Sequence, residues 1–271
     1  DILKAEADPQ AAASRLAVTA EGGGSQDNCT ALVLRVDALP AERLRDNVAR
    51  LRQLPLPPRL KPGQQLDGLT VEALLHESVV TLLYRVRDTR GKACVLKTLR
   101  PEHDDPEAAA ALAHEEWLAR RVSDAWFPQV IPHPQRSHLY YLMSWHEGAT
   151  LKARLDNGHR FGAGEVAELG TRILKGLAAL HRLSIVHRDI KPDNLHVDAE
   201  GRLRILDLGV AAADSQHDGQ AFEEINNPGT PSYMAPELHA ARPTPASEQT
   251  DLYAVGVTLY ELLTRKYPYG E

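Results

Sequence analysis

The sequence is poor in residues that build covalent or metal-rich frameworks, with two cysteines and two methionines among 271 residues. Cys29 and Cys94 are far apart and lie in apolar surroundings. This excludes a disulfide framework and favours a reducing, cytoplasmic setting. None of the 12 histidines has zinc spacing, since Leu118 stands where the motif beginning at His114 would need its second histidine.

The chain also lacks a long uncharged apolar run and an excess of basic charge. The longest candidate, Ala254–Leu263, is interrupted by Glu261 and is shorter than the roughly 20 residues of a membrane span, so we expect no membrane segment here. With 31 Lys and Arg against 37 Asp and Glu the net charge is −6, and we expect no nucleic-acid partner. The 43% of hydrophobic residues excludes a chain that is disordered throughout.

The first part of the chain has the pattern of a helix followed by a strand. Residues 1–20 are rich in alanine and helix-like, and the glycines at 22–24 should stop that helix. The apolar, partly β-branched run Asn28–Val36 is typical of a buried strand. Residues 37–65 end in clustered prolines, which favour a stiff connection, so we place a domain boundary there.

From Leu66 onward strands come first and helices follow, which predicts an α+β domain. The predicted strands are Thr70–Leu75, Val79–Arg87, Ala93–Lys97, His138–Trp145, Leu195–Val197 and Leu203–Leu206. The predicted helices are Pro106–Val122, Glu165–His181 and Asp251–Leu263. In the second helix apolar residues recur at helical spacing from Val166 to Leu180, as expected for a helix with one buried face.

Three motifs in a fixed order point to chemistry. Val186–Asn194 reads V-H-R-D-I-K-P-D-N, residues 207–209 read D-L-G, and Gly229–Glu237 reads G-T-P-S-Y-M-A-P-E. In this order they resemble the catalytic-loop, D-F-G and A-P-E motifs of eukaryotic-type protein kinases. The resemblance covers about Leu66 to Glu271, and the first motif is nearly unchanged.

The resemblance implies a two-lobed α+β protein-kinase fold that transfers the γ-phosphate of ATP to Ser or Thr hydroxyls of protein substrates. Asp189 would be the base that orients the incoming hydroxyl, and Lys191 would steady the γ-phosphate. Asn194 and Asp207 would bind Mg²⁺ through oxygen atoms. Lys191 together with Thr230 resembles the Ser/Thr branch of the family rather than the Tyr branch.

The run C-V-L-K that ends at Lys97 resembles the V-A-I-K strand of the family. Lys97 would then bind the α- and β-phosphates and pair with a glutamate on the following helix. Glu115 and Glu116 are both candidates. We favour Glu115, because Leu118 and Val122 then follow it on the packing face.

The same resemblance implies which residues line the nucleotide pocket. They are Ser78, Leu83, Val95, Met143 at the gatekeeper position, Trp145 in the hinge, and His196 on the floor beneath adenine. His196 is unusual, because the family has an apolar residue there. Asp251 resembles the start of the family's D-x-W-x-x-G helix, and we expect it to brace the backbone of the catalytic loop.

The loop that would cover the phosphates contains no glycine. His76, Ser78 and Thr81 stand at the three glycine positions of G-x-G-x-x-G. Because glycine lets backbone N–H groups approach phosphate, this predicts weaker or altered nucleotide binding, with the Ser78 hydroxyl as a partial replacement. The alternative hypothesis is therefore a non-catalytic pseudokinase, although all the charged catalytic positions are kept.

The chain ends at Glu271, soon after the Asp251 helix, whereas the family continues through several more helices. We therefore expect a C-terminal lobe truncated after that helix, with apolar surface uncovered, and at most weak activity from this chain.

Ser25–Thr30, after an alanine-rich helix and before a Val/Leu run, resembles the final D-N-x-T/S-V-V motif of type 2C metal-dependent phosphatases. This implies that residues 1–36 are a C-terminal phosphatase remnant, 37–65 a Pro-rich linker and 66–271 a kinase domain, in a bacterial phosphatase–kinase fusion. Asp27 would be a ligand of the phosphatase Mn²⁺ or Mg²⁺ site. In the pseudokinase alternative, the kinase-like domain would regulate this attached phosphatase. The alternative for Asp27 is a simple turn, since Asp and Asn tolerate left-handed conformations.

Overall fold

The computed structural model describes residues 2–24, 27–35, 50–51, 53–102, 105–209, 212–213, 230–238 and 246–269. The chain divides into two compact units, residues 1–43 and 44–271. Residues 37–49 and 52 of the predicted linker lie outside the described residues, as do Ser25 and Gln26 of the phosphatase-like motif.

The first unit contains the predicted helix, as a short α1 (Ile2–Ala5) and a longer α2 (Pro9–Gly22). Asp8 caps α2, because its carboxylate accepts hydrogen bonds from the backbone N–H groups of Gln10 and Ala11. As expected, α2 ends within the run of glycines.

The prediction of a buried strand over 28–36 is wrong. Residues 28–35 are extended, but they pair with no strand among the residues that the structure describes. Leu32 and Leu34 are 85% and 82% exposed. An apolar run becomes a buried strand only where a neighbouring strand accepts its backbone hydrogen bonds and a core covers its side chains, and the described residues of this unit offer neither.

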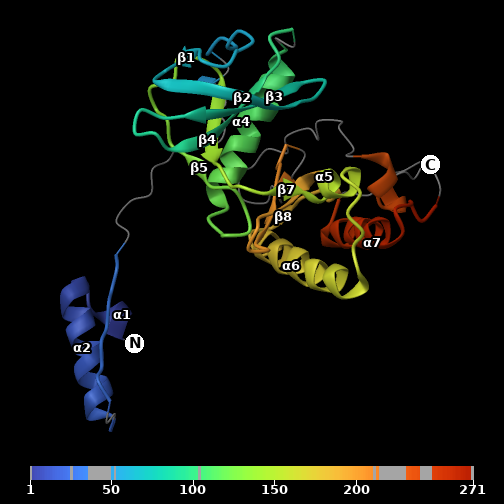
Figure 1. Ribbon diagram of the computed structural model, residues 1–271. Helices are drawn as coiled ribbons and strands as arrows, with labels where there is room; N and C mark the ends of the chain where they lie inside the picture. The colour runs from blue at the N-terminus through green and yellow to red at the C-terminus, as the bar shows by residue number, and fades with distance from the viewer. Residues whose placement is uncertain are drawn as a thin grey trace. The chain divides into compact units, whose positions relative to one another are not determined.

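The second unit has two lobes, of which the smaller is built on an antiparallel sheet in the order β1-β2-β3-β4-β6-β5 (Figure 1). The strand bounds are Gln65–Leu66 (β1), Leu69–Glu77 (β2), Thr81–Arg87 (β3), Ala93–Leu99 (β4), Val130–Ile131 (β5) and Tyr140–Ser144 (β6). Helix α4 (Pro106–Arg121) packs beside β4 (Figure 1). Asp105 caps α4 and Pro106 begins it, which explains where the helix starts.

The sheet has an apolar cluster on each side, and both include residues from the predicted linker. Leu60 packs with the strand residues Leu82 and Tyr84, and its backbone N–H donates to the Tyr84 hydroxyl. Leu51 lies in the other cluster, together with Leu112 of α4. The predicted linker over 37–65 is therefore too long, because its C-terminal part belongs to the sheet lobe.

The larger lobe is mostly helical. Its elements are β7 (Ala149–Thr150), α5 (Leu151–Asp156), α6 (Ala163–His181), β8 (Ile185–Val186), β9 (Leu195–Val197), β10 (Leu203–Ile205), β11 (Ala212–Ala213), α7 (Glu248–Thr264) and the 3₁₀ helices Pro192–Asn194, Pro231–Tyr233 and Pro236–Leu238. Strands β10, β9 and β7 form one small sheet, and β11 pairs with β8. The two-lobed α+β architecture agrees with the expected kinase-like fold.

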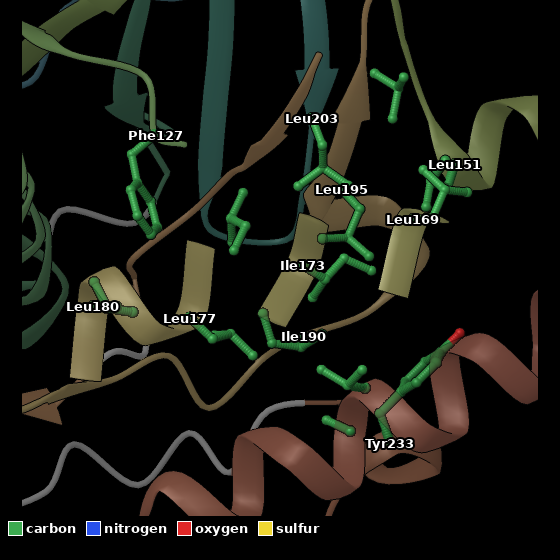
Figure 2. Close-up of a cluster of buried hydrophobic side chains, with 14 of the residues drawn as sticks. Phe127, Leu151, Leu169, Ile173, Leu177, Leu180, Ile190, Leu195, Leu203 and Tyr233 are labelled. Carbon is green, nitrogen blue, oxygen red and sulfur yellow. The ribbon is translucent and has the colours of Figure 1, made fainter. Parts of the chain in front are cut away.

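Helix α6 supplies one side of the large core (Figure 2). Leu169, Ile173 and Leu177 are buried at the predicted helical spacing, and they pack with Leu195 of β9 and Leu203 of β10. This core holds β9 and β10, which follow the motif at 186–194 and precede the motif at 207–209.

Helix α7 buries one face and leaves large apolar side chains exposed on another, including Leu252, Tyr260 and Leu263. Within the described ranges, no helix has the length and apolar character that a membrane crossing needs.

Candidate functional site

The catalytic loop is held in place by a buried carboxylate on α7. Asp251 accepts hydrogen bonds from the backbone N–H of His187 at 2.9 Å and of Arg188 at 2.8 Å. Arg188 has a left-handed backbone, with φ of +70°, which needs support from its surroundings. Asp251 is fully buried and also meets the His181 ring at 2.8 Å. The expected bracing role of Asp251 is therefore seen in the structure.

The ring of His187 is buried and engaged on both nitrogens. Its Nε2 lies 3.0 Å from the carbonyl oxygen of Leu206, and its Nδ1 lies 3.3 Å from the backbone nitrogen of Asp189. A neutral ring that donates through Nε2 and accepts at Nδ1 satisfies both contacts. His187 therefore connects the backbone at Asp189 with the backbone at Leu206, the residue that follows β10.

Asp189 lies at the centre of a hydrogen-bond network. Its Oδ1 accepts from the backbone N–H of Thr230 at 3.1 Å and from the Thr230 hydroxyl at 3.0 Å. Its Oδ2 lies 2.9 Å from Nδ2 of Asn194 and 2.7 Å from Nζ of Lys191. Lys191 also donates to the Thr230 hydroxyl at 2.6 Å. This carboxylate can therefore orient a hydroxyl group while an ammonium group lies on its other side.

Lys97 on β4 is buried between two carboxylates. Its Nζ lies 2.7 Å from Oε1 of Glu115 on α4 and 2.7 Å from Oδ1 of Asp207. Burial acts to lower the pKa of Lys97, but the two carboxylates outweigh it and raise the pKa above its ordinary value. The structure pairs Lys97 with Glu115 and directs Glu116 elsewhere, in line with the preferred alternative.

The pKa values of the two carboxylates beside Lys97 are shifted in opposite directions. Burial raises the pKa of Glu115 to about 7, even though Lys97 acts to lower it. Burial also acts to raise the pKa of Asp207, but Lys97 and the backbone N–H of Gly209 hold it well below its usual range. Asp207 is therefore ionised and available as a metal ligand.

Asn194 and Asp207 fit a magnesium site in their chemistry. The donor set is one carboxylate and one amide oxygen, and Mg²⁺ typically takes one or two protein oxygen ligands together with substrate phosphates. The described part of the chain contains no group of three or more His, Cys, Asp and Glu that could hold a metal on its own. A site completed by phosphate oxygens is consistent with that.

Asp27 belongs to no group of three or more possible metal ligands among the residues that the structure describes. It is exposed, and its Oδ1 accepts a hydrogen bond from the backbone N–H of Asn28 at 2.8 Å.

Three of the predicted pocket residues lie on neighbouring strands of the sheet. Val95 of β4 stands opposite Met143 of β6, and Leu83 of β3 stands opposite Lys97. Met143 also borders a small cavity that reaches Glu115. These positions bring the β4 and β6 residues to the same part of the sheet as Lys97.

The hinge residues Trp145 and His146 point to different partners. The guanidinium of Arg85 lies over the Trp145 ring at 4.7 Å, while the indole N–H donates to Glu147. Nε2 of His146 lies 2.8 Å from the Ser144 hydroxyl. His196 of β9 packs against the backbone of Gly148. A Cβ added to Gly148 would lie 2.8 Å from the His196 ring.

The Ser78 hydroxyl is engaged within its own hairpin. Its Oγ accepts from the backbone N–H of Val80 at 3.2 Å and of Thr81 at 2.9 Å. It also lies 2.9 Å from the Thr81 hydroxyl. The two amides at the tip of the loop are therefore already satisfied, which differs from the expectation that this hydroxyl faces phosphate.

Two residues that contact the glutamates of α4, Tyr141 and Arg136, were not predicted from the sequence. The Tyr141 hydroxyl donates to Oε1 of Glu115 at 2.8 Å, and Arg136 pairs with Glu116 at 2.8 Å. Tyr141 could have been found from its strand, because it lies two residues before Met143 and alternate residues share a face. Arg136 follows two prolines in a connecting segment, and no periodicity marks it.

Comparisons with known proteins agree with this geometry. A family model described as protein kinase domain matches residues 78–271. Serine/threonine-protein kinase pkn3 of Myxococcus xanthus is 32% identical over 209 residues, covering 73% of this chain and 38% of that protein. PknD of Chlamydia felis is 32% identical over 209 residues, covering 66% of this chain and 22% of that protein.

A further relative, the probable serine/threonine-protein kinase PknB of Lactococcus lactis, is 29% identical over 194 residues, covering 69% of this chain and 30% of that protein. The chain thus spans less than two fifths of the length of each of these three curated relatives.

Proposed function

The chain belongs to the protein kinase family, and on that premise we propose that it transfers the γ-phosphate of ATP to serine or threonine hydroxyls of protein substrates. One observation carries the proposal. The Lys97–Glu115 pair is formed at 2.7 Å, and Asp207 lies at the same distance from the same ammonium group. The names of the three relatives support Ser/Thr rather than Tyr as the acceptor.

In the proposed reaction Asp189 accepts a hydrogen bond from the incoming hydroxyl and orients its oxygen toward the γ-phosphorus. The contact with the Thr230 hydroxyl at 3.0 Å supports this role, since it is the same kind of contact. Lys191 lies beside that hydroxyl and would neutralise charge on the transferred group. The proton of the acceptor hydroxyl passes to the carboxylate as its oxygen forms the new P–O bond, while the bond between the γ-phosphorus and the β,γ-bridging oxygen of ATP breaks and ADP leaves with that electron pair.

Lys97 would bind the α- and β-phosphates, held by Glu115 on α4. Asn194 and Asp207 would hold Mg²⁺, which when bound neutralises charge on the phosphates. Ser78, Leu83, Val95, Met143, Trp145 and His196 are the proposed surroundings of the nucleotide. Cys29 and Cys94 are the two cysteines of the chain and lie far apart in the sequence, which supports a reducing, cytoplasmic location.

The test is transfer of labelled phosphate from Mg·ATP to a generic protein substrate. We expect Asp189→Asn and Asp207→Asn to lower the rate by about 100-fold or more, because each keeps the shape and removes the charge. Arg182→Gln, a change outside the proposed site, is the control. No transfer under any metal or substrate condition would overturn the proposal.

The pseudokinase alternative is favoured by one observation, the hairpin amides that are satisfied by Ser78. Nucleotide binding measured in the same experiment separates the two functions. Binding without transfer in the unaltered protein would support the pseudokinase.

For the first unit we retain the proposal of a type 2C phosphatase remnant, supported by the alanine-rich α2 and the D-N-C-T string at Asp27. Its test belongs to the full-length natural protein. Asp27→Asn should abolish Mn²⁺-dependent hydrolysis of a phosphopeptide and leave kinase transfer unchanged. Unchanged hydrolysis would leave Asp27 as a turn residue.

A further inference from the structure

Helix α4 carries a second buried glutamate, Glu116, which is 2% exposed and faces away from Lys97. Two guanidinium groups neutralise it. Arg120 reaches Oε1 through Nη2 at 2.7 Å and Nε at 3.2 Å, and Nη2 of Arg136 reaches Oε2 at 2.8 Å. Removing a partner from a buried ion pair is costly, so this network holds its members in place.

The two arginines come from different parts of the structure. Arg120 lies on α4 itself, one turn after Glu116, so its contact links the helix only to itself. Arg136 lies in the segment between β5 and β6, and its side chain is 8% exposed. It also donates through Nη1 to the carbonyl oxygen of Tyr140, the first residue of β6. Arg136 therefore joins α4 to the sheet.

This second link bears on the proposed catalytic pair because Glu115 and Glu116 are neighbours. Successive residues of a helix point about 100° apart, so two adjacent anchored side chains fix both the position of the helix and its rotation. Glu115 is anchored to Lys97 and Tyr141, and Glu116 is anchored to Arg136.

We propose that Arg136, acting through Glu116, is a positioning residue that holds α4 where Glu115 meets Lys97, independently of bound nucleotide. The inference rests on the proposed kinase function. It adds that contacts within this lobe hold α4 against the sheet.

The kinetic test compares Arg136→Met with Arg120→Met. Both variants remove one arginine from the Glu116 carboxylate, but only Arg136→Met removes the contact between Glu116 and the segment before β6. We expect Arg136→Met to lower kcat by about 10-fold or more, since small displacements of catalytic groups are costly. We expect Arg120→Met to change kcat by less than about 2-fold and Arg136→Lys, which keeps one charged contact, to recover part of the loss.

A second comparison separates positioning from general stabilisation. If Arg136 lowers kcat by displacing Glu115, Arg136→Met should cause no further loss of kcat in a Glu115→Gln background. If it only stabilises the lobe, the two losses should multiply. Multiplying losses, or equal effects of Arg136→Met and Arg120→Met, would overturn the proposal.

Hydrogen–deuterium exchange of residues 106–121 provides a readout that needs no activity. Arg136→Met should accelerate exchange in α4 without bound nucleotide, and Arg120→Met should change it less. If transfer is absent but this difference is found, the positioning role stands and the kinase proposal fails. If exchange is equal in the two variants, the positioning role fails whatever the activity.

Discussion

The ammonium group of Lys97 lies 2.7 Å from the carboxylate of Asp207, so the proposed phosphate ligand and the proposed metal ligand neutralise each other in this structure. Phosphate would compete for the lysine and a metal ion for the carboxylate. Binding both together replaces the lost ion pair with two new ones, whereas phosphate bound alone leaves Asp207 without its cation and a metal ion bound alone leaves Lys97 with Glu115 as its one remaining carboxylate of the two. Nucleotide and metal are therefore expected to bind cooperatively.

The first prediction concerns the charge balance around Lys97. Lys97→Met should abolish transfer and lower the free energy of unfolding by about 3–5 kcal/mol, because it leaves Asp207 without its cation and makes the buried Glu115 take up a proton on folding. Urea denaturation at pH 7.5 measures the stability. Adding Glu115→Gln to the variant removes the need for that proton and should restore part of the stability. A double variant no more stable than Lys97→Met would contradict this explanation.

The second prediction concerns the hairpin tip. Ser78→Gly should free the amides of Val80 and Thr81 for phosphate and tighten ATP binding by about 5-fold, equivalent to ~1 kcal/mol. Adenosine, which has no phosphate, is the internal control and should bind unchanged in an isothermal titration. If the Ser78 hydroxyl instead contacts phosphate, as the sequence suggested, the variant will bind ATP more weakly.

The third prediction compares two leucines of the segment before the sheet. Leu51→Ala and Leu60→Ala should each cost about 2–4 kcal/mol of unfolding free energy, because each leaves a cavity. Only Leu51 lies in the cluster with Leu112 of α4, so only Leu51→Ala should also lower kcat at a temperature where both variants are folded. Equal kcat values for the two variants would show that this segment does not influence α4.

The fourth prediction is a pH dependence of stability. Burial, together with Arg204 and His196, lowers the pKa of His146 from 6.5 to about 4. Between these values the unfolded chain binds a proton that the folded chain does not, so stability should fall as the pH drops from about 6.5 toward 4. His146→Gln should lose less stability than the unaltered protein between pH 7.5 and 5.5, measured by thermal denaturation.

The control for this pH experiment is His76→Gln, which changes an exposed ring of β2. Its midpoint should shift between the two pH values as that of the unaltered protein does. An unchanged pH dependence in His146→Gln would exclude His146 as the responsible group.

The kinase fold was predictable because its motifs and periodicities are local. The spacing of Leu169, Ile173 and Leu177 gave the buried face of α6, and the catalytic-loop motif gave the neighbours of Asp189. The choice of Glu115 over Glu116 also followed from helical spacing alone.

The errors arose where distant residues decide the structure. Leu32 and Leu34 have the pattern of a strand, but a strand needs a partner that the pattern does not contain. Clustered prolines marked residues 37–65 as a linker, yet Leu51 is buried among residues far along the chain. The arginine that holds Glu116 lies 20 residues away in a segment without periodicity.

The contact of Asp251 with the catalytic loop has a consequence for how the protein loses function on heating. The loop has a left-handed residue at Arg188, and its amides are held by a carboxylate on α7. If the N-terminal end of α7 separates from the helical lobe, the loop loses that acceptor while the sheet lobe remains folded. Activity would then report the docking of a single helix, and inactivation would precede the main loss of secondary structure.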